Sequence, residues 1–220
     1  DRPMMSNVLA DMAVEVEAAT LMSLRVAKAT DLMQSSEHER LLARVATPAA
    51  KYFNCSRAPS IANEALQCHG GNGFIEENPM ARVYREAPLN SVWEGTANMM
   101  CMDVRRAMIR DPRTVEAVFN ELKPLAGQDK RFDALVQHTE RLVRAAIEDE
   151  FLARPMTEAV ARVLQAAELL RYSSQEVADV FLSTRSGGDV GSWGAHYGTL
   201  GMSTSSSVAQ KIMLRAMVTD

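Results

Sequence analysis

The sequence predicts an all-α protein, and three observations support this fold class. Helix-forming residues, mainly Ala, Leu, Met, Glu and Arg, dominate the first 180 positions. Aromatic residues make up 5% of the chain, and stretches that alternate polar and apolar residues as strands do are nearly absent. Apolar residues instead recur every three or four positions over several long stretches. With 220 residues and a 47% hydrophobic composition, the chain is large enough to bury a substantial core.

The first helix is expected over residues 4–30. Its apolar stripe follows helical steps of four and three residues and comprises Met5, Leu9, Met12, Val16 and Ala19. The outer face of this helix is expected to hold the charged residues Asp11, Glu15 and Arg25.

The second helix is expected over residues 37–69. Its inward-facing residues are Leu41, Val45, Ala49 and Tyr52. Gly70 or Gly71 is expected to end it, because glycine readily adopts the left-handed conformation found after helix ends. Pro48 and Pro59 weigh against a continuous helix, since proline removes a backbone hydrogen bond.

Residues 70–93 are expected to form an irregular connection with one short helix near Ala81. A third long helix should run from Thr96, its expected N-cap, to about Asp111. Asp111 and Pro112 together are typical of a new cap followed by a first-turn proline. They predict a boundary that divides the chain into residues 1–110 and residues 111–220.

Beyond this boundary the apolar spacing predicts two packed antiparallel helices and a third shorter one over residues 177–184. The two stripes comprise Phe132, Leu135, Val136, Thr139, Leu142, Val143 and Ala146, and then Val160, Val163, Leu164, Ala167 and Leu170. The glycine-rich residues 186–194 are expected to form a flexible loop. Serines at residues 203–207 lead into a short basic and apolar tail.

Charge and cysteine content narrow the functional classes. The formal net charge is -4, and residues 103–220 carry 15 basic against 16 acidic residues. This balance argues against DNA as the main partner, because DNA-binding domains usually carry a basic surface. No apolar run approaches the length of a membrane span, and no secretory signal pattern is present, so a cytoplasmic protein is expected. The three cysteines form no Cys-x-x-Cys pair, so no metal site is expected.

Three short motifs carry the functional information. Residues 67–74 read Gln-Cys-His-Gly-Gly-Asn-Gly-Phe, residues 84–86 read Tyr-Arg-Glu, and residues 93–98 read Trp-Glu-Gly-Thr-Ala-Asn. In this order they resemble the C-terminal helical domain of the acyl-CoA dehydrogenases, whose pattern is Gln-x-x-Gly-Gly-x-Gly-Phe, Tyr-Arg-Asp and Tyr-Glu-Gly-Thr. The resemblance covers residues 1–110 and implies an antiparallel helical bundle of that type, with an additional C-terminal helical subdomain over residues 111–220.

The resemblance implies that Glu94 is the base that removes the α-proton of an acyl-CoA thioester. Such a proton is very weakly acidic, so the base should work in a dry pocket. Trp93 would supply an apolar wall and Gly95 would leave room for the acyl chain, which makes both candidate substrate-binding residues. From the residue alone, Glu94 is better explained as a first-turn carboxylate that the helix dipole favours, and the flanking motifs reverse this preference. Arg85 is expected to act as a structural ion-pairing residue that braces the loop before Glu94.

The resemblance also implies FAD as the cofactor. Gln67, Gly70, Gly71, Thr96 and Asn98 match positions whose family counterparts contact FAD, the glycine turn often doing so from a neighbouring subunit. Asn98 departs from the family's usual Gln or Glu. Without the other motifs, the glycines would be an ordinary helix stop, because the context of a phosphate-binding loop is missing.

Two features resemble one branch of the family, the DNA-alkylation-response flavoproteins. Trp precedes Glu94 where the family has Tyr, and more than 100 residues follow the motif. The bacterial prototype of this branch binds double-stranded DNA, so DNA is the second candidate partner. Arg105, Arg106, Arg110 and Arg113 could form a basic edge for it, although a solvated helix face explains them better.

The resemblance further implies an acyl-CoA substrate, an electron-transfer acceptor and a homotetramer, and a helical tetramerisation module is the third candidate function. The chain is expected to be the C-terminal part of a longer enzyme and, on its own, to be inactive and to retain no FAD.

Overall fold

The computed structural model describes residues 2–186, 196–201 and 204–217, and every regular element in these ranges is a helix. The predicted all-α fold class is confirmed. In chain order the elements are α1 (Pro3–Leu32), α2 (Glu37–Cys68), α3 (Gly71–Phe74), α4 (Pro79–Glu86), η1 (Ala87–Ser91), α5 (Ala97–Arg110), α6 (Arg113–Leu122), η2 (Lys123–Leu125), α7 (Lys130–Glu148), η3 (Glu150–Leu152), α8 (Ala153–Tyr172), α9 (Gln175–Arg185) and α10 (Ser206–Ala216). Within these ranges, no helix is both long and apolar enough to cross a bilayer.

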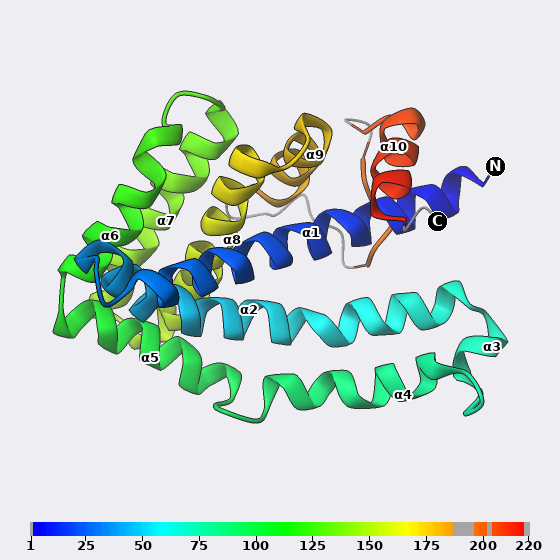
Figure 1. Ribbon diagram of the computed structural model, residues 1–220, viewed down its shortest axis with the longest axis horizontal. Coiled ribbons are helices and arrows are strands. Elements are labelled where there is room, and N and C mark those ends of the chain that lie inside the picture. Colours follow the sequence, from blue (N-terminus) through cyan, green and yellow to red (C-terminus); the bar gives the residue numbers. More distant parts are fainter. Residues whose placement is uncertain (1, 187–195, 202–203, 218–220) are drawn as a thin grey trace.

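Two regions can be distinguished in Figure 1. The C-terminal half of α2 runs antiparallel to α4 and η1, and α3 lies at the far end of this pair. We call residues 60–96 the arm. The remaining described helices form the body, in which α8 packs against α1, α2, α5, α7 and α9. This position explains why most of α8 is buried on every side.

Helix α2 continues through Pro48 and Pro59 without interruption. Its inward residues are those expected from the sequence, and Val45 and Ala49 are completely buried. Packing against α1, α5 and α8 outweighs the hydrogen bonds that the two prolines remove. The helix ends at Cys68, and Gly70 follows with φ of +59° and ψ of -146°. Glycine thus follows the helix end where the sequence predicts it, but its backbone is extended rather than left-handed helical.

The predicted faces of α1 are wrong. The stripe expected to be apolar is only partly buried, and Val16 is 48% exposed. The residues that pack into the core are instead Ala10, Val14, Ala18, Met22 and Ala29. Asp11, Glu15 and Arg25, expected on the outer face, are buried because each has an ion-pair partner on another helix.

Helices α5, α7, α8 and α9 agree with the sequence-based expectations, whereas α6 was predicted only through the cap at its start. The junction of α5 and α6 falls at Asp111 and Pro112, and the Asp111 side chain accepts a hydrogen bond from the amide of Arg113. Buried residues from both sides of this junction belong to one hydrophobic core. The division of the chain at residue 110 therefore stays a prediction.

The C-terminal segment differs from the expected tail. Residues 206–216 form α10, which Ser205 caps by accepting a hydrogen bond from the amide of Val208, and Ile212 of this helix is buried. Helix α10 packs across the N-terminal part of α1 (Figure 1). Most of the loop expected at residues 186–194 lies outside the described residues.

Candidate functional site

The motif residues form two separate groups on the arm. Gln67, Gly70 and Gly71 lie at the far end, where α2 turns into α3, and residues 93–98 lie where η1 leads into α5. Helix α4 and η1 together span roughly 20 Å between the two groups. One chain therefore does not bring the glycine turn together with Glu94.

Glu94 has an unusual backbone conformation. It is the one described residue other than glycine with a positive φ, at +54°. This conformation costs an L-residue about 1–2 kcal/mol. Its side chain is exposed, so the described residues do not form the dry pocket expected for a base.

Gly95 follows with φ of +108°, a conformation that strains other residues. A Cβ atom at this position would lie 2.4 Å from the terminal methyl group of Met100. Glycine at residue 95 thus allows both the turn and the close approach of the α5 side chain.

Lys51 of α2 binds the backbone of this turn at two points. Its ammonium group donates to the carbonyl of Asn90 and to the carbonyl of Gly95, each at 2.8 Å. The two carbonyls lie on either side of Glu94 in the chain. This contact was missed by the sequence reasoning, since no local pattern links a lysine to carbonyls about 40 residues away.

Thr96 occupies the N-cap position of α5, as expected, but within the described residues its side chain makes no capping hydrogen bond. Asn98 lies in the first turn, and both side chains are exposed. The start of this 14-residue helix can therefore accept an anionic group such as a phosphate.

The glycine turn at the other end is open as well. A Cβ atom on Gly70 or Gly71 would meet nothing within 4 Å, whereas one on Gly73 would lie 2.3 Å from the carbonyl oxygen of Leu66. Gly73 is thus required by packing, and the two exposed glycines leave space for a ligand to approach the backbone. These two groups of residues fit the anionic and backbone contacts that a dinucleotide cofactor such as FAD requires.

Large apolar side chains are exposed along the arm and its junction with α5. They are Phe74, Ile75, Val83, Tyr84, Leu89, Val92, Trp93 and Met99, and Phe74 is 76% exposed. Exposed apolar residues grouped in this way mark a surface that binds another molecule or another part of a protein.

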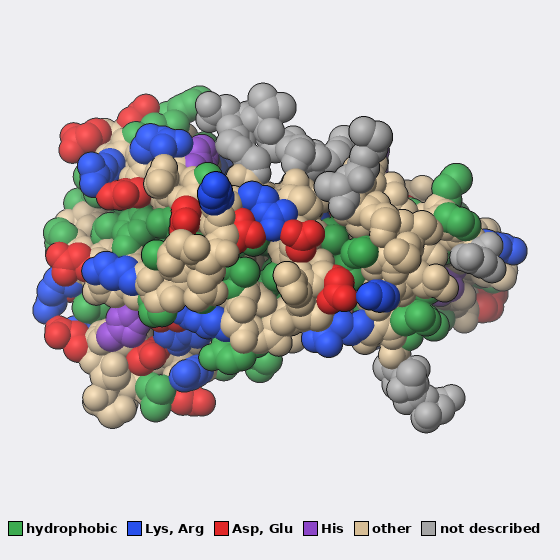
Figure 2. Space-filling view, turned by 90° about the horizontal axis from the view of Figure 1, so that it is seen from above, with side chains coloured by type: hydrophobic (Ala, Val, Ile, Leu, Met, Phe, Trp, Pro, Cys, Tyr) green, Lys and Arg blue, Asp and Glu red, His purple; other side chains and the backbone are tan. Residues whose placement is uncertain are grey.

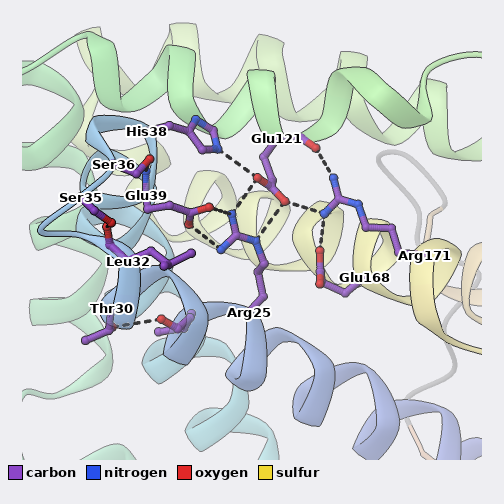
Figure 3. Close-up of polar contacts among 11 residues, drawn as sticks. Arg25, Thr30, Leu32, Ser35, Ser36, His38, Glu39, Glu121, Glu168 and Arg171 are labelled. Atoms are coloured by element: carbon purple, nitrogen blue, oxygen red, sulfur yellow. Dashed lines mark hydrogen bonds and ion pairs between the residues drawn. The ribbon is translucent and has the colours of Figure 1, made fainter.

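Two buried ion networks in the body were missed entirely by the sequence reasoning. The first joins four helices around Glu121 of α6, as Figure 3 shows. Arg25 of α1 donates to both Glu121 oxygens at 2.9 and 3.0 Å and also binds Glu39 of α2. His38 lies 3.1 Å from Glu121, and Arg171 of α8 binds the same carboxylate.

Burial and these contacts shift the pKa values of two glutamates in the network. Burial by itself would raise the pKa of Glu121, but hydrogen bonds from Arg25 and His38 and the charges of Arg25 and Arg171 lower that pKa to about 2. Glu168, which pairs with Arg171, behaves differently, because burial raises its pKa above the ordinary value.

The second network fixes α1 to α9 and to residues 196–201. Arg185 of α9 pairs with Asp11, and both side chains are 1% exposed. Glu15 binds Arg57 of α2 at 2.7 Å, and Arg57 donates to the hydroxyl of Tyr197 at 3.0 Å. Burial and the charge of Glu15 raise the pKa of Tyr197. One signal in the sequence could have revealed this face, the exact four-residue spacing of Ala10, Val14 and Ala18 beside Asp11 and Glu15.

The other charged candidates have local partners. Arg85 pairs with Glu76 in the turn before α4, rather than with the loop before Glu94, and both side chains are exposed. Arg105 donates to the last carbonyls of α7, and Arg113 pairs with Glu37 and Asp111. Two of the four arginines of the expected basic edge are thus engaged in structural contacts.

Figure 2 shows Lys and Arg side chains interspersed with Asp and Glu on the face in view. Among the described residues, no group of three or more His, Cys, Asp or Glu is arranged to hold a metal ion.

Comparisons with known proteins place these features in context. The family model described as acyl-CoA dehydrogenase, C-terminal domain, matches residues 1–109. AidB of Escherichia coli K12 is 35% identical over 190 residues, which cover 84% of this chain and 35% of AidB. The human mitochondrial short-chain specific acyl-CoA dehydrogenase is 31% identical over 106 residues, which cover 48% of this chain and 24% of that enzyme.

Among solved structures, ACDH-11 of Caenorhabditis elegans in complex with C11-CoA has a TM-score of 0.68 and 21% identity. That match covers 98% of this chain and 36% of ACDH-11, so the extension after residue 110 is included in the shared fold. The chain spans about a third of the length of AidB and of ACDH-11.

Proposed function

The chain belongs to the acyl-CoA dehydrogenase family through its C-terminal helical domain, and on that basis we propose that it is the C-terminal part of an FAD-dependent acyl-CoA dehydrogenase with Glu94 as the α-proton base. The observation that carries this proposal is the backbone of Glu94. A glutamate is held at φ of +54° in an exposed turn, at the position of the family motif. Strained residues of this kind are concentrated at functional sites.

Each residue of the Glu94 turn has its own role in the proposed reaction. The Glu94 carboxylate accepts the proton from the carbon next to the thioester carbonyl. Trp93 and Gly95 form part of the wall along the acyl chain, and Thr96 and Asn98 bind an anionic part of the cofactor at the start of α5. The chemistry that bound FAD would supply is acceptance of the hydride that leaves the neighbouring carbon.

Water exclusion must come from outside the described residues, because Glu94 is exposed within them. Removal of a weakly acidic α-proton requires a base whose own affinity for protons is raised, and exclusion of water raises it. The exposed apolar residues of the arm are suited to this closure, since they would be covered by another part of a longer enzyme or by another subunit. By itself the chain should therefore be inactive and retain no FAD.

The distance between the two motif groups favours a homotetramer or another assembly in which copies share cofactors. The glycine turn and the Glu94 turn are separated by α4 and η1, which span roughly 20 Å. In such an assembly the glycine turn of one copy and the Glu94 turn of another would contact the same cofactor from its two ends. The electrons would leave through a separate acceptor.

The test is anaerobic addition of straight and branched acyl-CoAs to the full-length enzyme while the flavin absorbance is followed. Glu94→Gln should slow bleaching by about 10²–10⁴-fold, the usual contribution of a general base. Glu77→Gln, an exposed glutamate of the same arm, is the matched control and should bleach at the normal rate. Equal rates in the two variants would exclude Glu94 as the base.

One observation favours a second function, association with double-stranded DNA. The match to AidB spans 190 residues and therefore extends past residue 109, whereas the match to the human short-chain dehydrogenase spans 106 residues; ACDH-11 shares the fold of the extension as well. Arg106 and Arg110 lie exposed on α5 near Arg113. If they contact phosphates, Arg106→Gln with Arg110→Gln should weaken duplex binding and reduce its salt dependence, whereas Arg82→Gln on the arm should not.

A further inference from the structure

The turn that carries Glu94 has few internal restraints. The amides of Val92 and Trp93 both donate to the carbonyl of Leu89, which continues η1, and the carbonyl of Thr96 accepts from Met100 at the start of α5. Between these ends, among the described residues, neither Glu94 nor Gly95 donates a backbone hydrogen bond. The positive φ of both residues must therefore be maintained by contacts from elsewhere.

Lys51 provides such a contact. Its ammonium group donates to the carbonyls of Asn90 and Gly95 at 2.8 Å each, so a single group holds the start and the end of the turn. Hydrogen bonds from a charged donor are shorter and stronger than neutral ones. The side chain is partly buried, which limits competition from water.

The part of α2 that carries Lys51 is packed into the hydrophobic core. Its neighbours Ala50 and Tyr52 are 8% and 7% exposed and belong to the hydrophobic core. Lys51 thus connects an exposed, strained turn to one of the most firmly packed parts of the body.

We propose that Lys51 is the positioning residue of the Glu94 turn, because it fixes the place of the Glu94 carboxylate relative to the core through the two carbonyls on either side of it. The effect of Lys51 on catalysis, its catalytic aspect, rests on the function proposed above. Its contact with the turn, the structural aspect, does not depend on that function. Lys51 donates to carbonyl groups of the turn and so acts through Glu94. Its loss should affect the rate of proton removal more than the binding of acyl-CoA.

The structural aspect is tested by hydrogen exchange on the 220-residue chain. In Lys51→Met the amides of Val92 and Trp93, which donate to Leu89 just before Glu94, should exchange at least about tenfold faster, because the two charged hydrogen bonds that hold the turn are lost. Amides of α1 and α8 should keep their rates. Lys51→Arg should restore slow exchange, since a guanidinium group can donate to both carbonyls.

Lys28→Met is the matched control, because Lys28 is an exposed lysine of α1 away from the turn. It should leave exchange of the Val92 and Trp93 amides unchanged. If Lys51→Met also leaves exchange of these two amides unchanged, the positioning role is wrong.

The catalytic aspect is tested in the full-length enzyme by separating kcat from KM. Lys51→Met should lower kcat at least about tenfold with little change in the KM for acyl-CoA, and Lys51→Arg should recover most of the loss. Loss of activity in Glu94→Gln together with normal kcat in Lys51→Met would overturn this inference alone. Faster exchange in Lys51→Met together with full activity in Glu94→Gln would support the contact of Lys51 with the turn and would exclude Glu94 as the base.

Discussion

The arm and the body of this protein use their polar residues in opposite ways. In the body, charged side chains such as Arg25, Glu121 and Arg185 are buried and paired between helices that are distant in sequence. On the arm, the motif residues are exposed, and so are the large apolar side chains around them. The difference indicates that the body is organised for the stability of the chain, whereas the arm is organised for contact with something else.

The largest effect is expected in the second buried network. Arg185→Met should destabilise the chain by about 3–5 kcal/mol, because the Asp11 carboxylate would remain buried without its arginine. Urea unfolding would measure this loss. Arg82→Met on the arm removes an exposed pair with Glu86 and should change stability by less than about 0.5 kcal/mol. Similar losses in the two variants would remove the distinction between arm and body.

A smaller effect is expected from the pH dependence of the first network. Because the folded pKa of Glu121 is about 2 and its ordinary value is 4.5, the unfolded chain binds this proton first as the pH falls. The stabilisation is therefore complete above the ordinary pKa and is lost as the pH approaches the folded value. Between about pH 6 and about pH 3 the loss should be about 2 kcal/mol.

Comparison of the wild type with Glu121→Gln by urea unfolding across this range isolates the effect. The stability difference between the two proteins should shrink towards low pH, because glutamine does not titrate. Glu168, whose pKa burial raises, acts in the opposite direction, and it does so less strongly in Glu121→Gln because the charge of Glu121 also raises that pKa. A difference that is constant with pH would contradict the assignment to Glu121.

The smallest effect is expected on the arm and has the opposite sign. Glu94→Gly should stabilise the chain by about 0.5–1 kcal/mol, because glycine adopts φ of +54° without strain although it gains entropy in the unfolded chain. Glu94→Ala keeps the Cβ atom and should give no gain. Thermal unfolding of both variants would test this. A loss of stability in Glu94→Gly would mean that the turn is not strained.

Helix positions were predictable because they depend on local patterns. The apolar spacing in residues 130–172 corresponds closely to α7 and α8, and Gly70 and Asp111 mark helix boundaries through local backbone chemistry. The α1 faces were not predictable in this way. Apolar spacing shows which residues could be buried, but a carboxylate or guanidinium becomes buried only when a partner is present, and the partners of Asp11 and Arg25 come from α9 and α6.

The candidate site shows the same division. The sequence by itself determined the family and the positions of Glu94, Gly95 and the glycine turn, because those motifs are short and continuous. Tertiary structure alone decided that Glu94 has a positive φ, that Lys51 holds both ends of its turn, and that the two motif groups lie apart. The physical reason is that local spacing determines helices, whereas long-range hydrogen bonds and ion pairs depend on residues that only folding brings together.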